Sequence, residues 1–477
     1  MADKEVLLSV QHLEQFFKMG RHQLKAVNDV SFDIYKGEVF GLVGESGCGK
    51  TTTGRSIIRL YDITGGSVYF GGTRICAGTR RYKEAIANAR KQLKAEVKAL
   101  QAQKTEELNA AGSDAQKQEI ETKYATLISQ KEADFKAFAD TQVEEIRKAK
   151  FDHKYCNREY ARAQQKLVDD KYLPMLEQAA TEEQKKQLTA EYKHERRLAG
   201  KDRITNKMQM IFQDPIASLD PRMTVREIIA EGLVIRGIRD KKLINQKVYE
   251  VLDLVGLVPE HAGRYPHEFS GGQRQRIGIA RAIVLNPELI IADEPISALD
   301  VSIQAQVINL LNDLRDRLGL TILFIAHDLS VVKYFSDRIA VMYFGNLVEL
   351  TTSDELFAHP LHPYTKSLLS AIPIPDPHVE KQRKRITYNP LASHDYSEDL
   401  PSLREVAPGH FVHCNNEEFA RYKEELVSGV SQAVDHTAAN AAKMEAAAGK
   451  KKAKAAPKKA PTKKPAEKKP SGKSSKK

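Results

Sequence analysis

The sequence predicts an α/β fold that is interrupted by a long helical segment. Residues 1–76 show short alternating apolar runs between glycine-rich turns, which is typical of strands. Residues 206–350 alternate strand and helix signals, which indicates strands covered by helices. Between them, residues 80–200 are rich in Ala, Lys, Glu and Gln, and their apolar residues recur at helical spacing. We therefore expect one α/β domain in two parts, with a helical insertion between them.

The charge and the cysteines limit the class of protein. The chain of 477 residues has a net charge of +11, but residues 450–477 hold thirteen Lys and one Glu and contribute +12. The remaining body has a charge of 11 − 12 = −1, so the basicity belongs to a tail and not to a nucleic-acid-binding face. The four cysteines are scattered without a CxxC pair, which favours a reducing cytoplasm and argues against a zinc or iron–sulfur site.

No segment has the character of a membrane span or a secretory signal. A span needs about 18 or more consecutive apolar residues, and the sequence has no such run. The N-terminal sequence MADKEVLLSV lacks the basic-then-apolar layout of a signal peptide. We expect any attachment to a membrane to be peripheral.

The glycine-rich stretch GESGCGKT at residues 44–51 is the first motif that carries chemistry. It fits the phosphate-loop (P-loop) pattern GxxxxGK[ST], follows an expected strand at 39–43 and precedes a helical run at 52–60. Its backbone N–H groups would converge on phosphate oxygens at a helix N-terminus. Lys50 would reach the β- and γ-phosphates, and Thr51 would offer its hydroxyl to Mg²⁺. The expected ATP-binding residues of this stretch are Gly44, Glu45, Ser46, Gly47, Cys48, Gly49, Lys50, Thr51 and Thr52.

Three polar side chains follow apolar runs and could complete a catalytic site. The run LIIADE ends in Asp293, which can hold Mg²⁺ through its water shell, and Glu294, which can polarise the attacking water. The run TILFIAH ends in His327, which could donate to the γ-phosphate at the edge of a parallel sheet. Gln213 would assist both Mg²⁺ and water, although alone it is equally consistent with a polar turn before Pro215. Because the same chain also contains a P-loop, we favour a catalytic role for these residues over the alternative that they are solvated polar groups at strand ends.

A second glycine-rich stretch, FSGGQ at 269–273, forms another possible anion site. Ser270 and the N–H groups of Gly271 and Gly272 would lie at the start of a helix over 276–284. The chain's own P-loop already surrounds one triphosphate, so the second site makes sense if it closes over another subunit's nucleotide. In a two-fold dimer each P-loop then faces the partner's FSGGQ, as an isologous interface requires.

The order of the motifs resembles that of the ATP-binding subunits of ABC transporters. The motifs occur as P-loop, Gln213, FSGGQ, Asp293-Glu294, SALD at 297–300 and His327. The resemblance implies a RecA-like core, an antiparallel β subdomain and a helical signature subdomain, with two ATP molecules between two subunits. It also implies that Phe17 stacks on adenine, with Phe16 as a possible substitute. The residues implied to act on the partner's ATP are Ser270, Gly271, Gly272, Gln273 and Asp300.

Three longer stretches resemble the oligopeptide/dipeptide importer branch, and its second ATPase subunit more than its first. They are QMIFQDPIASLDPRMTV at 209–225, YPHEFSGGQRQRIGIARA at 265–282 and HPLHPYTKSLLSAIPIPDP at 359–377. That branch also includes nickel and some oligosaccharide importers. In the last stretch Pro363 suits the first position of a helix. Its expected buried side consists of Leu368, Leu369 and Ile372, as a packed appendage that does not touch the solute.

The resemblance covers residues 5–76 and 206–415, and it divides the chain into five parts. These are the first part of the ATPase domain (1–76), a coiled-coil-like helical insertion (77–205), the second part of the domain (206–350), an extension of short helices (351–430) and a disordered Lys/Ala/Pro tail (431–477). Inside the insertion we expect a turn at 111–114 and further breaks at Asn157 and Pro174. The insertion is either a solvated hairpin or a docking arm for a regulator, and the basic tail could bind anionic lipid or, non-specifically, nucleic acid.

The resemblance implies an ATPase that uses ATP and Mg²⁺ to drive peptide import at the cytoplasmic face of the cell membrane. The implied partners are two transmembrane permease subunits, a second ATPase subunit in a heterodimer and, indirectly, an extracellular solute-binding protein. The alternative is a soluble ABC-type ATPase whose coiled-coil arm acts on nucleic acid. Against it, the insertion is short, Gln213 follows the coil, and the motif at 362–365 stays unexplained. No specific nucleic acid is expected, and the sequence does not specify the solute.

Overall fold

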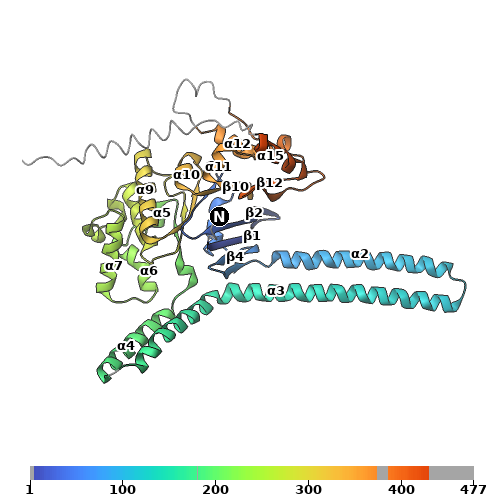
Figure 1. The fold of residues 1–477 in the computed structure, drawn as a ribbon, viewed down its shortest axis with the longest axis horizontal. Helices are drawn as coiled ribbons and strands as arrows, with labels where there is room; N and C mark the ends of the chain where they lie inside the picture. The colour runs from blue at the N-terminus through green and yellow to red at the C-terminus, as the bar shows by residue number, and fades with distance from the viewer. Residues whose placement is uncertain (1–4, 180, 373–384, 429–477) are drawn as a thin grey trace, which may run out of the picture.

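The strands of the computed structural model form two sheets, and the described residues are 5–179, 181–372 and 385–428 (Figure 1). The antiparallel sheet has the order β2-β1-β4-β5, with bounds β1 Val6–Met19, β2 His22–Tyr35, β4 Gly65–Phe70 and β5 Thr73–Ala77. The larger sheet has the order β11-β12-β10-β9-β3-β8-β7-β6. Its bounds are β3 Val39–Val43, β6 Met208–Ile211, β7 Leu289–Asp293, β8 Thr321–Ala326, β9 Arg338–Tyr343, β10 Asn346–Thr352, β11 Ser402–Ala407 and β12 His410–Cys414.

The centre of the larger sheet is parallel and covered on both faces. Strand β3 pairs in parallel with β8 and β9, and β7 pairs in parallel with β8 and β6. Every residue of β3, β7 and β8 is buried, as expected for continuous apolar strands between two layers. Val39 and Val43 join a core shared with helices, whereas Phe40 and Leu42 join a core shared with the antiparallel sheet. The predicted α/β class is therefore confirmed.

Helices that follow the insertion in the sequence cover one face of this sheet. They are α5 Pro215–Ser218, α6 Val225–Ile235, α7 Lys241–Leu254, α8 Gly271–Ile283, α9 Val301–Leu318 and α10 Leu329–Phe335. Helix α6 packs on both α7 and α8, which makes a small helical subdomain around the FSGGQ stretch. Helix α1, Lys50–Ile57, begins inside the P-loop motif and contacts β7 and β8. Within the described ranges, no helix has the length and hydropathy of a membrane span.

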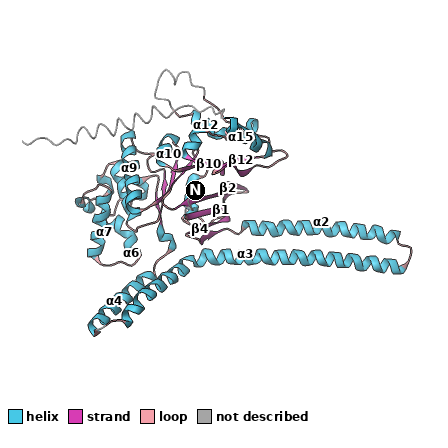
Figure 2. Cartoon of the chain, viewed as in Figure 1, coloured by secondary structure: helices cyan, strands magenta, loops and turns pink. Residues whose placement is uncertain are grey.

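The insertion consists of two helical hairpins that share one long helix (Figure 2). Helix α2 (Arg80–Ala110) runs along the first part of α3 (Asp114–Glu177), and α4 (Glu182–Ala199) packs back on the last part of α3. The turn expected at 111–114 is confirmed, because Ser113 caps α3 by accepting a hydrogen bond from the Gln116 N–H. The coiled-coil description stays a prediction.

The expected helix break at Asn157 is wrong, and the break at Pro174 is displaced. Helix α3 passes through Asn157, whose side-chain oxygen accepts hydrogen bonds from the N–H and hydroxyl of Thr205. An Asn side chain engaged outside its own helix does not compete with the helical backbone. Pro174 lies inside α3, but the helix ends soon after it, at Glu177.

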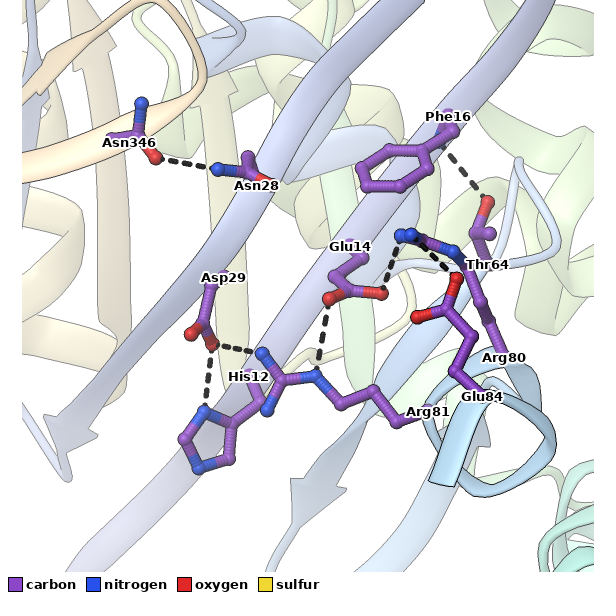
Figure 3. Close-up of polar contacts among 10 residues, drawn as sticks. All are labelled: His12, Glu14, Phe16, Asn28, Asp29, Thr64, Arg80, Arg81, Glu84 and Asn346. Atoms are coloured by element: carbon purple, nitrogen blue, oxygen red, sulfur yellow. Dashed lines mark hydrogen bonds and ion pairs between the residues drawn. The ribbon is translucent and has the colours of Figure 1, made fainter. Parts of the chain in front are cut away.

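The insertion is fixed to the antiparallel sheet at the base of α2 (Figure 3). Arg80 and Arg81 lie 3.3 Å and 3.1 Å from the Glu14 carboxylate, and Arg81 also pairs with Asp29. Glu14 is buried, so removing either arginine would leave its carboxylate poorly compensated. The Arg80 guanidinium also lies 4.2 Å from the centre of the Phe16 ring. The base of α2 is thereby attached to the strand that carries Phe16.

A second attachment comes from the middle of α3. Arg74 of β5 lies 2.6 Å from Asp152, and its side chain is only 12% exposed. Arg59 donates to the backbone oxygen of His153 at 2.6 Å and to the sulfur of Cys156. Two attachments, one on each helix, determine the direction in which the long hairpin leaves the domain.

The C-terminal extension contains strands that the sequence did not predict. Its helices are α11 Ser353–Ala358, α12 Pro363–Ser370, α14 Pro390–Ser393 and α15 Asn416–Ser428. The expectation of short helices alone is incomplete, because β11 and β12 form a hairpin that extends the larger sheet beside β10. Pro363 begins α12 as expected, with Leu369 and Ile372 buried and Leu368 partly buried. The predicted disordered tail, residues 431–477, lies outside the described residues.

Shortening the long hairpin should leave the ATPase domain stable. Glu96 and Lys131 face each other across the hairpin at 3.0 Å, so deleting residues 97–130 and closing the gap with a short Gly-Ser turn keeps the helices in register. Figure 1 shows the deleted part pointing away from both sheets. We expect the melting temperature to change by less than about 2 °C in differential scanning fluorimetry.

The matched control is Arg74→Met, which breaks the attachment at Asp152 without shortening the arm. It should lower the melting temperature by several degrees, because the loss of a hydrogen bond between charged groups lowers the free energy of unfolding. A larger loss from the deletion than from the control would show that the outer hairpin supports the domain.

Candidate nucleotide-binding site

Four expected site residues lie at the carboxyl ends of four neighbouring parallel strands. Gly44 follows β3, His327 follows β8, Asp293 ends β7, and Gln213 comes two residues after β6. These strands lie side by side in the order β3-β8-β7-β6, so their carboxyl ends meet at one edge of the sheet. That edge is where ligands bind in parallel α/β sheets.

The P-loop wraps closely against neighbouring backbone on its rear side. A Cβ at Gly44, whose φ is 151°, would lie 2.2 Å from the backbone oxygen of Met342. A Cβ at Gly49, whose φ is 108°, would lie 2.2 Å from the backbone oxygen of Ala26. Residues 45–47 are exposed on the other side. The loop is therefore closed behind and open in front, which suits a backbone cradle for phosphate.

Lys50 is held by the loop itself. Its side chain is buried, and its Nζ donates to the backbone oxygens of Gly44 at 2.7 Å and Glu45 at 2.9 Å. A phosphate oxygen in the loop could replace either carbonyl as the acceptor. The neighbouring Cys48 is also buried, and burial raises the pKa of its thiol although Lys50 opposes the shift. Cys48 therefore stays neutral and leaves Lys50 as the cation of the loop.

Thr51 and Asp293 form a candidate cation site. The Thr51 hydroxyl donates to Asp293 Oδ1 at 2.7 Å. Asp293 is fully buried, burial raises its pKa, and its Oδ2 has no hydrogen-bond partner in the described part of the chain. The Arg55 guanidinium lies 3.9 Å from this oxygen. A hydroxyl and an unsatisfied carboxylate oxygen are ligands that Mg²⁺ accepts, so these residues fit that cation.

Gln213 and His327 converge on the same oxygen of Glu294. Gln213 Nε2 donates to Glu294 Oε2 at 2.8 Å, and His327 Nδ1 lies 3.3 Å from that oxygen. Glu294 has a φ of 44°, which is rare for a non-glycine residue and is common at functional sites. Its N–H donates to the Ile325 oxygen at 3.0 Å, which fixes this backbone against β8. The carboxylate is thereby placed beside the cation site, where it could orient water.

The FSGGQ residues lie apart from the chain's own P-loop. Ser270 caps α8 by accepting from the Gln273 N–H, and Gln273 accepts from the Ser270 N–H at 3.1 Å. Gly272 packs against α9, where an added Cβ would lie 2.6 Å from Ile303. Asp300 precedes the first residue of α9, and its carboxylate accepts a hydrogen bond from the Ser302 hydroxyl. Among the hydrogen bonds of the described residues, none joins these residues to the P-loop, so their action on a partner's ATP stays a prediction.

Of the two candidate adenine platforms, Phe17 has the more accessible ring. It is half-buried and meets Tyr61 edge-on at 5.4 Å. Phe16 is 8% exposed and lies under Arg80, as Figure 3 shows. The stacking role of Phe17 stays a prediction that this geometry favours.

Two residues near the site were not predicted. Arg55 lies four residues after Thr51 on α1, and this spacing could have placed it on the same helix face, toward Asp293. The hydroxyl of Tyr364, in the C-terminal extension, accepts a hydrogen bond from the Glu45 N–H at 3.1 Å. The two residues are 319 positions apart, and no local pattern predicts their contact.

Comparison with known proteins agrees with this geometry. The family model for ABC transporters matches residues 27–169 and 173–297, and the model for the oligopeptide/dipeptide transporter C-terminal region matches residues 348–398. The chain is 46% identical over 419 residues to the oligopeptide transport ATP-binding protein OppF of Bacillus subtilis (strain 168), an alignment that covers 88% of this chain and 99% of that protein.

Two further relatives give similar values. Identity is 41% over 424 residues to the OppF protein of Streptococcus mutans, with 88% of this chain and 99% of that protein covered. It is 40% over 428 residues to the dipeptide transport ATP-binding protein DppF of Lactococcus lactis subsp. cremoris, with 89% and 99% covered. The expected resemblance is confirmed, and the chain belongs to the ATP-binding proteins of the ABC transporter family, in the branch with an oligopeptide/dipeptide transporter C-terminal region.

Proposed function

We propose that this chain hydrolyses ATP to energise an ABC importer for oligopeptides or dipeptides at the cytoplasmic face of the cell membrane. The observation that carries the proposal is the convergence of Gln213 and His327 on the Glu294 carboxylate. Glu294 is the residue after Asp293, which accepts a hydrogen bond from Thr51. The peptide class is supported by the match of residues 348–398 and by the names of the relatives.

Each site residue has a role in phosphoryl transfer under this proposal. Lys50 would exchange the loop carbonyls for the β- and γ-phosphates, and Thr51, Asp293 and Gln213 are the residues that would hold Mg²⁺. Mg²⁺, when bound, would neutralise charge on the phosphate oxygens. Glu294 polarises the attacking water, and His327 donates to the γ-phosphate.

The proposed assembly needs partners on two sides. A second ATPase subunit would cover the P-loop with its own FSGGQ stretch, and Ser270 to Gln273 of this chain would cover the partner's ATP. Two permease subunits would cross the membrane, and an extracellular binding protein would deliver the solute. The nucleic-acid alternative has no support, because the matched models and relatives are transport proteins.

Replacing the proposed base should separate binding from hydrolysis. Glu294→Gln keeps the shape of the side chain and removes its basicity, so ATP should still bind while phosphate release falls at least about 100-fold. With ATP present, the variant should accumulate as a closed dimer in size-exclusion chromatography. Glu119→Gln is the control, because Glu119 is exposed on α3, far from the site residues in the sequence and outside the site. Unchanged turnover in Glu294→Gln would remove Glu294 from the role of base.

A charge in the FSGGQ stretch should damage the partner's site and spare this chain's own. An Asp side chain fits at Gly271, where an added Cβ meets only Leu299, at 3.6 Å. In the complex of Gly271→Asp with a wild-type partner, photolabelling of this chain's P-loop by azido-ATP should persist. Hydrolysis at the partner's site should fall. The control is Gly263→Asp, at an exposed position where an added Cβ meets nothing within 4 Å. Equal effects of both variants would contradict the dimer arrangement.

Isolation from native membranes tests the proposed partners directly. The tagged chain should recover two polytopic membrane proteins and a second ABC ATPase in mild detergent, identified by mass spectrometry. A co-purified binding protein would then identify the solute. Recovery of nucleic acid, ribosomes or repair proteins without permeases would overturn the transport proposal.

A further inference from the structure

One hydroxyl links the C-terminal extension to the P-loop. Tyr364, the second residue of α12, accepts a hydrogen bond from the N–H of Glu45 at 3.1 Å. Glu45 is the second residue of the P-loop. The extension is therefore more than an appendage packed at the edge of the domain, because it binds the backbone that cradles phosphate.

The Tyr364 ring is held rigidly. It is 1% exposed, and its centre lies 4.4 Å from the ring of Tyr343 at the end of β9 and 5.5 Å from the ring of Tyr388. Burial raises the pKa of the Tyr364 hydroxyl, so this group stays neutral. A buried aromatic ring in such a cluster has few alternative positions, so its hydroxyl points to one place.

The start of α12 is anchored to the larger sheet. The fully buried Glu349 of β10 accepts hydrogen bonds from Leu361 N at 2.8 Å and His362 N at 3.1 Å, and it lies 2.9 Å from His410 Nε2. His362 Nδ1 then accepts from the N–H of Tyr364. Burial lowers the pKa of His362 well below its usual value, which keeps the imidazole neutral and able to accept. The backbone that carries Tyr364 is thus fixed by the same sheet that carries the P-loop.

The Glu45 N–H lies in the part of the loop whose carbonyl groups would lose Lys50 when phosphate binds. The carbonyls of Gly44 and Glu45 hold Lys50 Nζ, and a bound phosphate would take that ammonium group away from them. The later part of the loop keeps a separate support, since the Cys48 oxygen accepts from Gly345 N at 2.9 Å. In the first turn, the hydrogen bond that the Glu45 N–H donates to the Tyr364 hydroxyl ties the loop to a group outside it, whereas the bond from the Cys48 N–H to the Glu45 oxygen lies within the loop.

We propose that Tyr364 is a positioning residue of the nucleotide site, through which the C-terminal extension holds the first turn of the P-loop ready for phosphate. This rests on the proposed function, since it assumes that the P-loop binds a nucleotide. Without the hydroxyl, the loop would populate other conformations. The apparent dissociation constant of the nucleotide would then equal its intrinsic value divided by the fraction of molecules whose loop is competent to bind.

Tyr364→Phe tests the proposal with Tyr388→Phe as its matched control. Both variants keep a ring in the same aromatic cluster, but Tyr364→Phe alone removes the hydroxyl that contacts Glu45. The dissociation constants of ATP and ADP, titrated as their fluorescent mant derivatives, should both rise about three- to tenfold in Tyr364→Phe. Both nucleotides place a β-phosphate in the loop, so the two effects should be equal. The KM for ATP should rise with little change in kcat, and the melting temperature should match that of the control.

Amide hydrogen exchange gives a readout that does not depend on nucleotide. In the nucleotide-free protein, the peptide that contains Glu45 should exchange faster in Tyr364→Phe than in the wild type or in Tyr388→Phe. Unchanged nucleotide affinity in Tyr364→Phe, with or without a loss of melting temperature, would assign Tyr364 to packing and overturn the proposal. Failure of the wild type to bind nucleotide would instead overturn the proposed function.

Discussion

The parallel pairing of β3, β8, β7 and β6 is the constraint on which the rest of the structure depends. It brings together residues that are far apart in the sequence, because each of these strands ends at the same edge of the sheet. A slip of one residue would exchange the side chains that a strand presents to the two cores and would shift Asp293 and His327 relative to the P-loop. The sandwich of a helical layer and an antiparallel sheet makes such a slip costly, since Val39 and Phe40 are each buried on a different side.

The polar groups at this edge form hydrogen bonds with one another, and a bound nucleotide could take the place of these internal partners. Lys50 is bound by loop carbonyls, Thr51 donates to Asp293, and Glu294 accepts from Gln213. Lys50 and Asp293 are buried, and leaving such groups without partners would destabilise the fold by several kcal/mol. The exchange of internal partners for phosphate, cation and water is therefore what binding must achieve. Asp293 Oδ2 has no hydrogen-bond partner among the residues that the structure describes, so it is the acceptor most open to a bound cation.

Local patterns predicted the features that depend on neighbouring residues. The P-loop, the polar residues at strand ends, the turn at 111–114 and the helix start at Pro363 each follow from a few consecutive residues. The sequence could not reveal features that depend on distant partners. Helix α3 continues through Asn157 because Thr205 occupies its side chain, and the hairpin of β11 and β12 forms because the edge of β10 is available. The contact of Tyr364 with Glu45 belongs to the same class.

The two segments that surround the α/β domain attach at different ends of the expected nucleotide. The insertion binds Glu14, three residues before Phe17 on β1, where the adenine ring is expected to stack. The extension binds Glu45 in the loop where the phosphates are expected. Both attachments use partly or fully buried polar groups. Such groups can form their hydrogen bonds in few arrangements, so they fix the relative position of two segments better than exposed ion pairs do. Neither segment can shift at its base without moving a residue next to the site, so the site's geometry depends on residues well outside its motifs.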